Sequence, residues 1–261
     1  ISGSSGKLYA QILQGAPFDV FLSADTLKPL ALFNQSKASL PFTYARGQLV
    51  VFVNQRVLTH TTAQAPTQAF LLWLNCAFLN DPPKDHEPKT VLLETSKTIH
   101  SQTCQAIKTV AIANPSFAPY GQAAQGLLAD LMADSMGDFA EANPHALPEF
   151  VKLIVAENIS QVAHYVKSGG VDVGFMAASL LPFKLNSGKT DTASAQWQRV
   201  PNGWLWWPKA QSYSPIVQQG VILPSAQPEL AQALRDYLLS DEVQYQLQHQ
   251  WHYLPLPSSM Y

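Results

Sequence analysis

Three short stretches of the chain place hydrogen-bond donors at the start of predicted helices. Ser4 and Ser5 precede the first such helix, Tyr120 lies at the head of another, and Ile159 begins a third. The first N–H groups of a helix lack an intrahelical acceptor and lie at the positive end of the helix dipole, which favours anions. Serine hydroxyls also donate hydrogen bonds. Since Glu157 is the one carboxylate or histidine in these stretches, they predict the binding of a small anion by uncharged donors.

The clearest of the three stretches is residues 154–178. A short apolar strand ends at Ala156, Asn158 is a good helix N-cap, and apolar residues then recur at helical spacing. Gly169 and the glycine after it stop the helix, and residues 171–176 form the next strand. This pattern is a βαβ unit. Its helix begins at the carboxyl end of a strand, where α/β sheets bind their ligands.

Strands and helices alternate along most of the chain, which predicts an α/β fold with mixed, mainly parallel sheets flanked by helices. The polar residues 182–202 are predicted to be a loop, and residues 59–102 carry no clear pattern. The predicted strands cover residues 18–22, 49–53, 109–113, 150–155, 171–176, 204–207 and 216–223. The predicted helices cover residues 8–13, 23–33, 119–131, 158–168, 228–238 and 241–247, the last capped by Asp241.

Composition narrows the class of protein. The chain has 261 residues, of which 47% are apolar and 13% charged, so it is globular rather than disordered. A formal net charge of -2 argues against a nucleic-acid partner. No apolar run is long enough to span a bilayer. No signal peptide is visible, so we expect a mature, cytoplasmic or truncated chain. The sequence alone does not decide whether Cys76 and Cys104 form a disulfide.

Other kinds of chemistry have little support. The chain has no nucleophile elbow, dinucleotide-binding fingerprint or P-loop. His249 and His252 lie three residues apart on a predicted helix, but a metal site needs further ligands, and none lies nearby in sequence. We therefore predict no protein-bound metal cation and no cofactor. An enzyme would need a general base in the candidate loops, and Glu157 is the one candidate.

Several stretches together resemble the periplasmic molybdate-binding proteins, the solute-binding components of molybdate ABC transporters. The most specific is Gly-Ala-Pro-Phe-Asp-Val-Phe-Leu-Ser-Ala-Asp over residues 15–25, which follows Ser4 and Ser5 as it does in the family. The shorter matches, Asn-Pro with Ala-Pro-Tyr-Gly, Ala-Glu-Asn-Ile, Gly-Phe-Met and Ser-Pro-Ile-Val, occur in the family's order at residues 114–121, 156–159, 174–176 and 214–217. The resemblance covers most of the chain. The chain begins about where the family's second strand ends, so the family's first strand and its loop have no counterpart in it.

The resemblance implies a two-lobed periplasmic binding protein fold of type II. One lobe would comprise residues 1–52 and 215–261, and the other residues 53–214 with an insertion near 60–102. The family implies a monomer in the periplasm that closes on a tetrahedral oxyanion, molybdate or tungstate, and delivers it to a membrane ABC permease. The alternatives are an enzyme on the same fold that acts on a small anionic substrate, or a truncated remnant that binds nothing.

The resemblance also assigns roles to the candidate residues. Ser5 would donate its hydroxyl and backbone N–H to the anion, and Ser4 could replace or assist it. Tyr120 and Ile159 would each donate a backbone N–H from the head of a helix. Some family members add a tyrosine hydroxyl from the position of Ala177, which has none, and members with tyrosine at the position of Tyr120 do without it.

Overall fold

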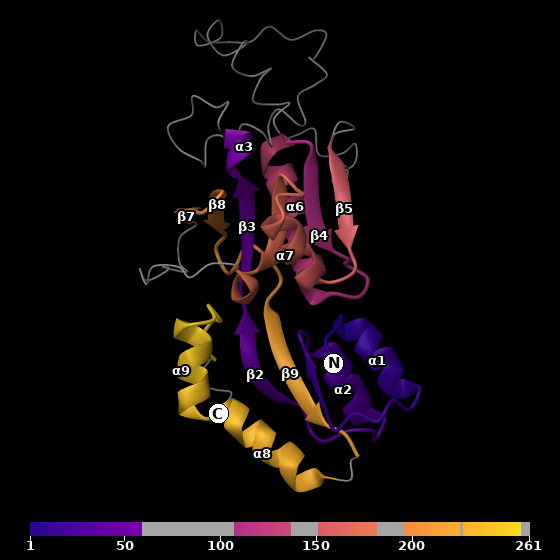
Figure 1. The fold of residues 1–261 in the computed structure, drawn as a ribbon. Helices are drawn as coiled ribbons and strands as arrows, with labels where there is room; N and C mark the ends of the chain where they lie inside the picture. The colour runs from indigo at the N-terminus through magenta and orange to yellow at the C-terminus, as the bar shows by residue number, and fades with distance from the viewer. Residues whose placement is uncertain (59–106, 137–150, 182–195, 225–226, 257–261) are drawn as a thin grey trace, which may run out of the picture.

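The computed structural model describes residues 1–58, 107–136, 151–181, 196–224 and 227–256, and it contains two β-sheets stacked end to end along the molecule (Figure 1). The smaller sheet has the strand order β1-β9-β2 and consists of β1 (Val20–Ser23), β9 (Ile216–Ile222) and β2 (Phe42–Gly47). The larger sheet has the order β5-β4-β6-β3-β8-β7. Its strands are β3 (Leu49–Asn54), β4 (Thr109–Ala113), β5 (Lys152–Ala156), β6 (Val173–Ala177), β7 (Gln196–Val200) and β8 (Gly203–Trp207).

The larger sheet is mixed, as predicted, but the described strands are not mainly parallel. Two pairings are parallel, β4 with β5 and β4 with β6, and the other pairings in both sheets are antiparallel. One reason is the connection of β7 to β8, which is a tight turn at Asn202 rather than a helix. A turn of this length can join only antiparallel strands. The sequence prediction missed both β7, in the supposed loop, and β2.

Helices cover the larger sheet on both faces, which explains why its central strand is apolar throughout. Side chains alternate between faces along β3. Leu49, Val51 and Val53 pack in one cluster with α6 (Pro119–Met136), and Val50 and Phe52 pack on the other face with α7 (Ile159–Lys167). The five residues have at most 2% of their surface exposed. A strand buried on both faces reads as a continuous apolar run.

The smaller sheet is also covered on both sides. Phe21 and Val221 pack against helices α1 (Ser5–Leu13) and α2 (Leu27–Asn34). Val20 faces α8 (Pro228–Leu239) on the other side. Three shorter elements complete the described fold: α3 (Gln55–Leu58), the 3-10 turn η2 (Ala178–Leu180) and α9 (Asp241–His249). No described helix is long and apolar enough to cross a membrane.

Asp172 fastens the strand ends of the larger sheet that lie far from the smaller one. Its carboxylate accepts hydrogen bonds from the N–H groups of Lys108 and Thr109, from the hydroxyl of Thr109 and from Nε of Arg56, at 2.7–2.9 Å. Burial raises the pKa of this carboxyl, but these hydrogen bonds outweigh burial and hold the pKa below its ordinary value. The Asp172 carboxylate therefore stays charged at neutral pH and links these strand ends to one another.

The chain crosses between the two sheets twice within the described residues, after β2 and before β9 (Figure 1). The first crossing is Gln48 alone, because β2 ends at Gly47 and β3 begins at Leu49. The predicted lobe boundary between residues 52 and 53 falls within β3. The predicted insertion at residues 60–102 and the two cysteines lie outside the described residues.

The sequence predicted the N-cap residue of α7 correctly and that of α9 incorrectly. The side chain of Asn158 accepts a hydrogen bond from the N–H of Gln161 at 3.0 Å, so Asn158 caps α7 as predicted. The predicted cap of α9, Asp241, is instead its first residue. Ser240 is the cap and accepts from the N–H of Val243 at 3.4 Å. Aspartate in the first turn is stabilising there because of the helix dipole.

Candidate anion-binding site

The start of α1 holds both candidate serines. Ser5 is the first residue of the helix, and it is 7% exposed. Its Oγ accepts a hydrogen bond from the N–H of Ala24 at 3.0 Å. Because a serine hydroxyl can accept and donate at the same time, the O–H proton of Ser5 remains able to donate. The bond to Ala24 fixes where that hydroxyl lies.

Ser4 is the N-cap residue of α1, with extended backbone geometry, but its side chain makes no capping hydrogen bond. The residue is 5% exposed, and its Oγ has no hydrogen-bond partner among the described residues. An unsatisfied buried hydroxyl costs about 1–3 kcal/mol. A bound acceptor would remove this cost, so the unpaired oxygen is a feature that points to a ligand.

The other two candidates lie at helix starts on the larger sheet. Tyr120 is the second residue of α6, and Ile159 is the first residue of α7. Their N–H groups fall in first turns, where the helix itself supplies no acceptor. The cap Asn158 satisfies Gln161, two residues beyond Ile159. The Ile159 side chain is core, packed against both clusters of the larger sheet, so only its backbone can serve a ligand.

Two contacts bring the three helix starts together between the sheets. The N–H of Gly6 in α1 donates to the carbonyl of Phe117, in the loop before α6, at 3.2 Å. A side chain at Gly6 would crowd Phe117, because its Cβ would lie 3.3 Å from the Phe117 Cα. Lys7 of α1 forms an exposed ion pair with Glu157, in the loop before α7. Figure 1 shows the start of α1 below the lower ends of α6 and α7.

The Tyr120 side chain contacts the strands that lead from one sheet to the other. Its hydroxyl accepts a hydrogen bond from Nε2 of Gln218 in β9 at 3.3 Å. A side chain at Gly47 would collide with it, because the added Cβ would lie 2.2 Å from the hydroxyl oxygen. Burial raises the pKa of Tyr120 well above its ordinary value, so the hydroxyl stays protonated at neutral pH.

The start of α2 differs from these three, because a carboxylate of the protein itself binds an N–H group there. Near the start of α2, the carboxylate of Asp25 accepts from the N–H of Lys28 at 2.9 Å and pairs with its ammonium group at 2.7 Å. The Oγ of Ser23 accepts from the N–H of Asp25 at 3.3 Å. Asp25 and Lys28 thus satisfy each other near the start of α2, whose N-cap position is Thr26. The starts of α1, α6 and α7 contain no such carboxylate, and Glu157 is held by Lys7 at the exposed rim.

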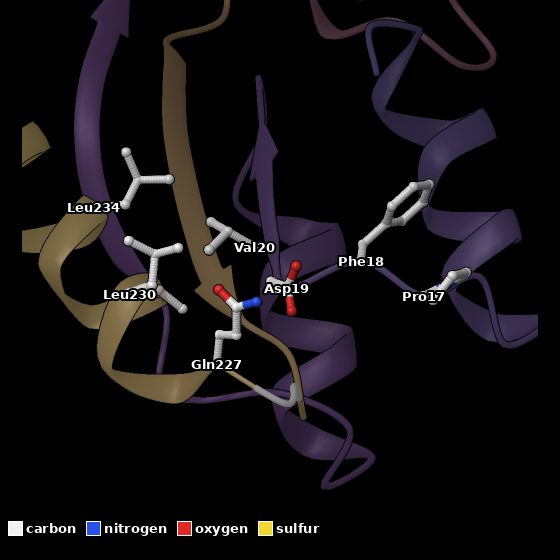
Figure 2. A pocket seen from close by; sticks show the side chains of 8 residues that line it. Pro17, Phe18, Asp19, Val20, Gln227, Leu230 and Leu234 are labelled. Atoms are coloured by element: carbon white, nitrogen blue, oxygen red, sulfur yellow. The ribbon is translucent and has the colours of Figure 1, made fainter.

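A separate pocket of about 490 Å³ lies between β1 and α8 (Figure 2). Leu230 and Leu234 of α8 form one wall, and Val20 of β1 lies opposite them. The pocket is mostly apolar, and its one charged group is the carboxylate of Asp19, which would repel an anion. It is therefore not the predicted site.

The two C-terminal histidines do not come together. His249 stacks on Tyr245 with ring centroids 4.1 Å apart, and His252 packs edge-on against Trp207 at 5.9 Å. In the part of the chain that the structure describes, no cluster of three or more His, Cys, Asp or Glu residues could hold a metal ion.

Two α/β units joined by crossing strands, with helix starts facing each other between them, define a periplasmic binding protein fold of type II. Residues 1–251 match the family model of the bacterial extracellular solute-binding proteins, and the chain belongs to this family. The predicted resemblance and the predicted fold type are confirmed.

Molybdate-binding proteins are among the relatives. The chain is 30% identical to the molybdate-binding protein ModA of Rhodobacter capsulatus over 92% of this chain and 71% of that protein. It is 31% identical to ModA of Azotobacter vinelandii over 90% of this chain and 71% of that protein. The solved structure of the periplasmic molybdate-binding protein of A. vinelandii superposes with a TM-score of 0.62 at 27% identity, covering 99% of this chain and 87% of that one.

The sequence prediction missed the residues that connect the candidate donors. Gly6 and Lys7 hold α1 against the larger sheet, and Gln218 donates a hydrogen bond to the Tyr120 hydroxyl. For Gln218 a signal was present, because two glutamines and a glycine at residues 218–220 interrupt an otherwise apolar strand. A buried polar side chain in such a strand needs a partner. For Gly6 and Lys7 the local sequence pattern gave no such signal.

Proposed function

We propose that this protein binds a tetrahedral oxyanion, molybdate or tungstate, between its two sheets and delivers it to the membrane permease of an ABC importer. The observation that carries the proposal is the start of α1, where the buried Ser4 hydroxyl lacks a partner in the described structure and where Gly6 and Lys7 contact the loops before α6 and α7. Membership of the extracellular solute-binding family and the molybdate-binding relatives support it.

The chemistry of the donors supports a fully deprotonated dianion. Molybdate has no proton to donate at neutral pH, so a selective site should contain donors only. Ser4 and Ser5 would supply hydroxyls, and Ser5, Tyr120 and Ile159 would supply backbone N–H groups. Each hydrogen bond to a charged group contributes about 1.5–3 kcal/mol net. About five of them suffice for tight binding when the loops are preorganised.

We further propose that the two sheets are the cores of two lobes that close on the anion. In this proposal the lobes meet at Gln48 and at the crossing before β9, and Gly6 and Lys7 carry contacts across the closed cleft. The protein would act as a monomer in the periplasm, without nucleic acid, cofactor or catalytic activity. Molybdate and tungstate have nearly equal sizes, so we expect both to bind, whereas sulfate would be excluded by the size of the closed cavity.

An enzyme on the same fold is the weaker proposal. It would need a general base near the anion. Glu157, the one carboxylate in the candidate loops, is exposed and paired with Lys7 at the rim.

Titration calorimetry with molybdate, tungstate, sulfate and phosphate tests the proposal. We expect heat from molybdate and tungstate, and at least tenfold weaker binding of sulfate and phosphate. Ser5→Ala should weaken molybdate binding more than Ser23→Ala does, because the Oγ of Ser23 accepts from Asp25 within the neighbouring helix start. Absence of heat with all four anions would refute the function, and equal effects of the two variants would remove Ser5 from the site.

A further inference from the structure

Two consecutive hydrogen bonds, one partly buried and one buried, connect the smaller sheet to α6. The hydroxyl of Tyr44 in β2 donates to Oε1 of Gln218 in β9 at 3.0 Å, and Nε2 of Gln218 donates to the hydroxyl of Tyr120 in α6 at 3.3 Å. Gln218 is 5% exposed and Tyr120 is 4% exposed. Since Tyr44 and Gln218 belong to the smaller sheet and α6 packs on the larger one, these hydrogen bonds span the region where the lobes join.

The tyrosines are chemically suited to this role. Burial is the main cause that raises the pKa of Tyr44 and of Tyr120, so both hydroxyls keep their protons. A protonated Tyr44 can donate to the amide oxygen of Gln218, which orients the amide nitrogen toward Tyr120. The amide thus has a defined orientation, with one tyrosine on each side.

The Tyr120 hydroxyl lies close against Gly47. A Cβ at Gly47 would lie 2.2 Å from that oxygen and 3.0 Å from Nε2 of Gln218. Gly47 is the last residue of β2, next to the crossing at Gln48. The absence of a side chain at residue 47 is therefore what lets α6 approach the crossing strands so closely.

We propose that Gln218 is a positioning residue for oxyanion binding. By holding the hydroxyl of Tyr120 against β9, it sets the first turn of α6, and hence the Tyr120 N–H, opposite Ser4 and Ser5 in the closed protein. This inference rests on the proposed function. It assigns the Tyr120 side chain to lobe closure, whereas only the backbone of Tyr120 contacts the anion.

The test compares Tyr120→Phe, Gln218→Met and the double variant with a matched control, Tyr9→Phe. The Tyr9 hydroxyl also accepts from a glutamine Nε2, that of Gln35 at 3.2 Å, but both residues lie in the smaller lobe. Molybdate affinity is measured by calorimetry. We expect each single variant to lose about 3- to 10-fold in affinity, the double variant to lose no more than the larger single loss, and the control to stay within about twofold.

Other outcomes overturn the inference. If Tyr120→Phe weakens binding and Gln218→Met does not, the hydroxyl acts on the anion directly. If the two losses multiply in the double variant, the residues act independently. If Tyr120→Phe lowers the melting temperature of the ligand-free protein as much as that of the molybdate-bound protein, the bond belongs to the general core rather than to closure.

A second measurement needs no ligand and separates this inference from the proposed function. Small-angle X-ray scattering of the ligand-free protein should give a larger radius of gyration for Tyr120→Phe than for the wild type or Tyr9→Phe, because the closed arrangement loses a contact between lobes. Equal radii would overturn the positioning role. A wild type that binds no oxyanion would refute the proposed function, and the scattering comparison would then still decide whether the hydrogen bond between Gln218 and Tyr120 holds the lobes together.

Discussion

Replacing Ser4 with alanine should change stability and binding in opposite directions. The Ser4 Oγ is buried without a hydrogen-bond partner in the described structure, and its side chain does not cap α1. Removing it deletes an unsatisfied hydroxyl that costs about 1–3 kcal/mol and breaks no described hydrogen bond. The ligand-free variant should therefore be as stable as the wild type or more stable, despite the loss of a serine at an N-cap position.

Binding should weaken in the same variant. A hydrogen bond from Ser4 to a dianion contributes about 1.5–3 kcal/mol, which corresponds to about 10- to 150-fold in the molybdate dissociation constant. Urea unfolding without ligand and calorimetry with molybdate measure the two effects. Ser2→Ala, at an exposed position two residues away, is the control and should change neither.

Ser5→Ala provides the contrast, because the Oγ of Ser5 accepts from the Ala24 N–H. Its removal leaves that N–H without this acceptor, so ligand-free stability should fall by about 1–3 kcal/mol while binding also weakens. If Ser4→Ala lowers ligand-free stability by a similar amount and leaves molybdate affinity unchanged, Ser4 is a structural cap and the reasoning about its hydroxyl is wrong.

Three further outcomes follow from particular contacts. Asp172→Asn should cost about 1–3 kcal/mol of unfolding free energy at pH 7. The pKa of Asp172 is lowered in the folded protein, so its contribution to stability is complete above the unfolded pKa of about 4 and disappears as pH falls through the folded pKa. Urea titrations from pH 7 to pH 2 would show this loss. A difference in unfolding free energy between variant and wild type that does not change with pH would contradict it. Gly47→Ala should weaken molybdate binding at least tenfold in calorimetry, since its methyl group would collide with the Tyr120 hydroxyl, and unchanged affinity would mean that α6 can move freely. Lys7→Ala removes an exposed ion pair with Glu157, so it should change molybdate affinity by less than about 1 kcal/mol, with a smaller effect still at high salt; a large loss would place Lys7 on the anion.

Sequence reasoning succeeded where local pattern determines structure. The apolar run of residues 49–53 predicted β3, which is buried on both faces, and Asn158 predicted the start of α7 because its side chain satisfies a first-turn N–H. A helix after β1 was also predicted, although α2 begins at Leu27 rather than at Ser23, which is the last residue of β1. These features depend on residues a few positions apart, so the sequence displays them directly.

Features that depend on distant residues could not be predicted in this way. The Tyr120 side chain was expected at a helix head, but its hydroxyl turns to Gln218, 98 residues later, in a space that Gly47 leaves open. The contact of Gly6 with Phe117 likewise joins elements far apart in the chain. Strand direction was misjudged for the same reason, since the pairing of β3 with β8 depends on tertiary packing rather than on local pattern.

The central claim is that an oxyanion binds where the starts of α1, α6 and α7 meet, and a crystal structure with bound molybdate tests it most directly. The anomalous signal of molybdenum locates the ion independently of any assumption about its ligands. The ion should lie within hydrogen-bond reach of the hydroxyls of Ser4 and Ser5 and of the N–H groups of Tyr120 and Ile159. A molybdenum peak elsewhere, such as the pocket between β1 and α8, or no peak at saturating molybdate, would contradict the proposed site.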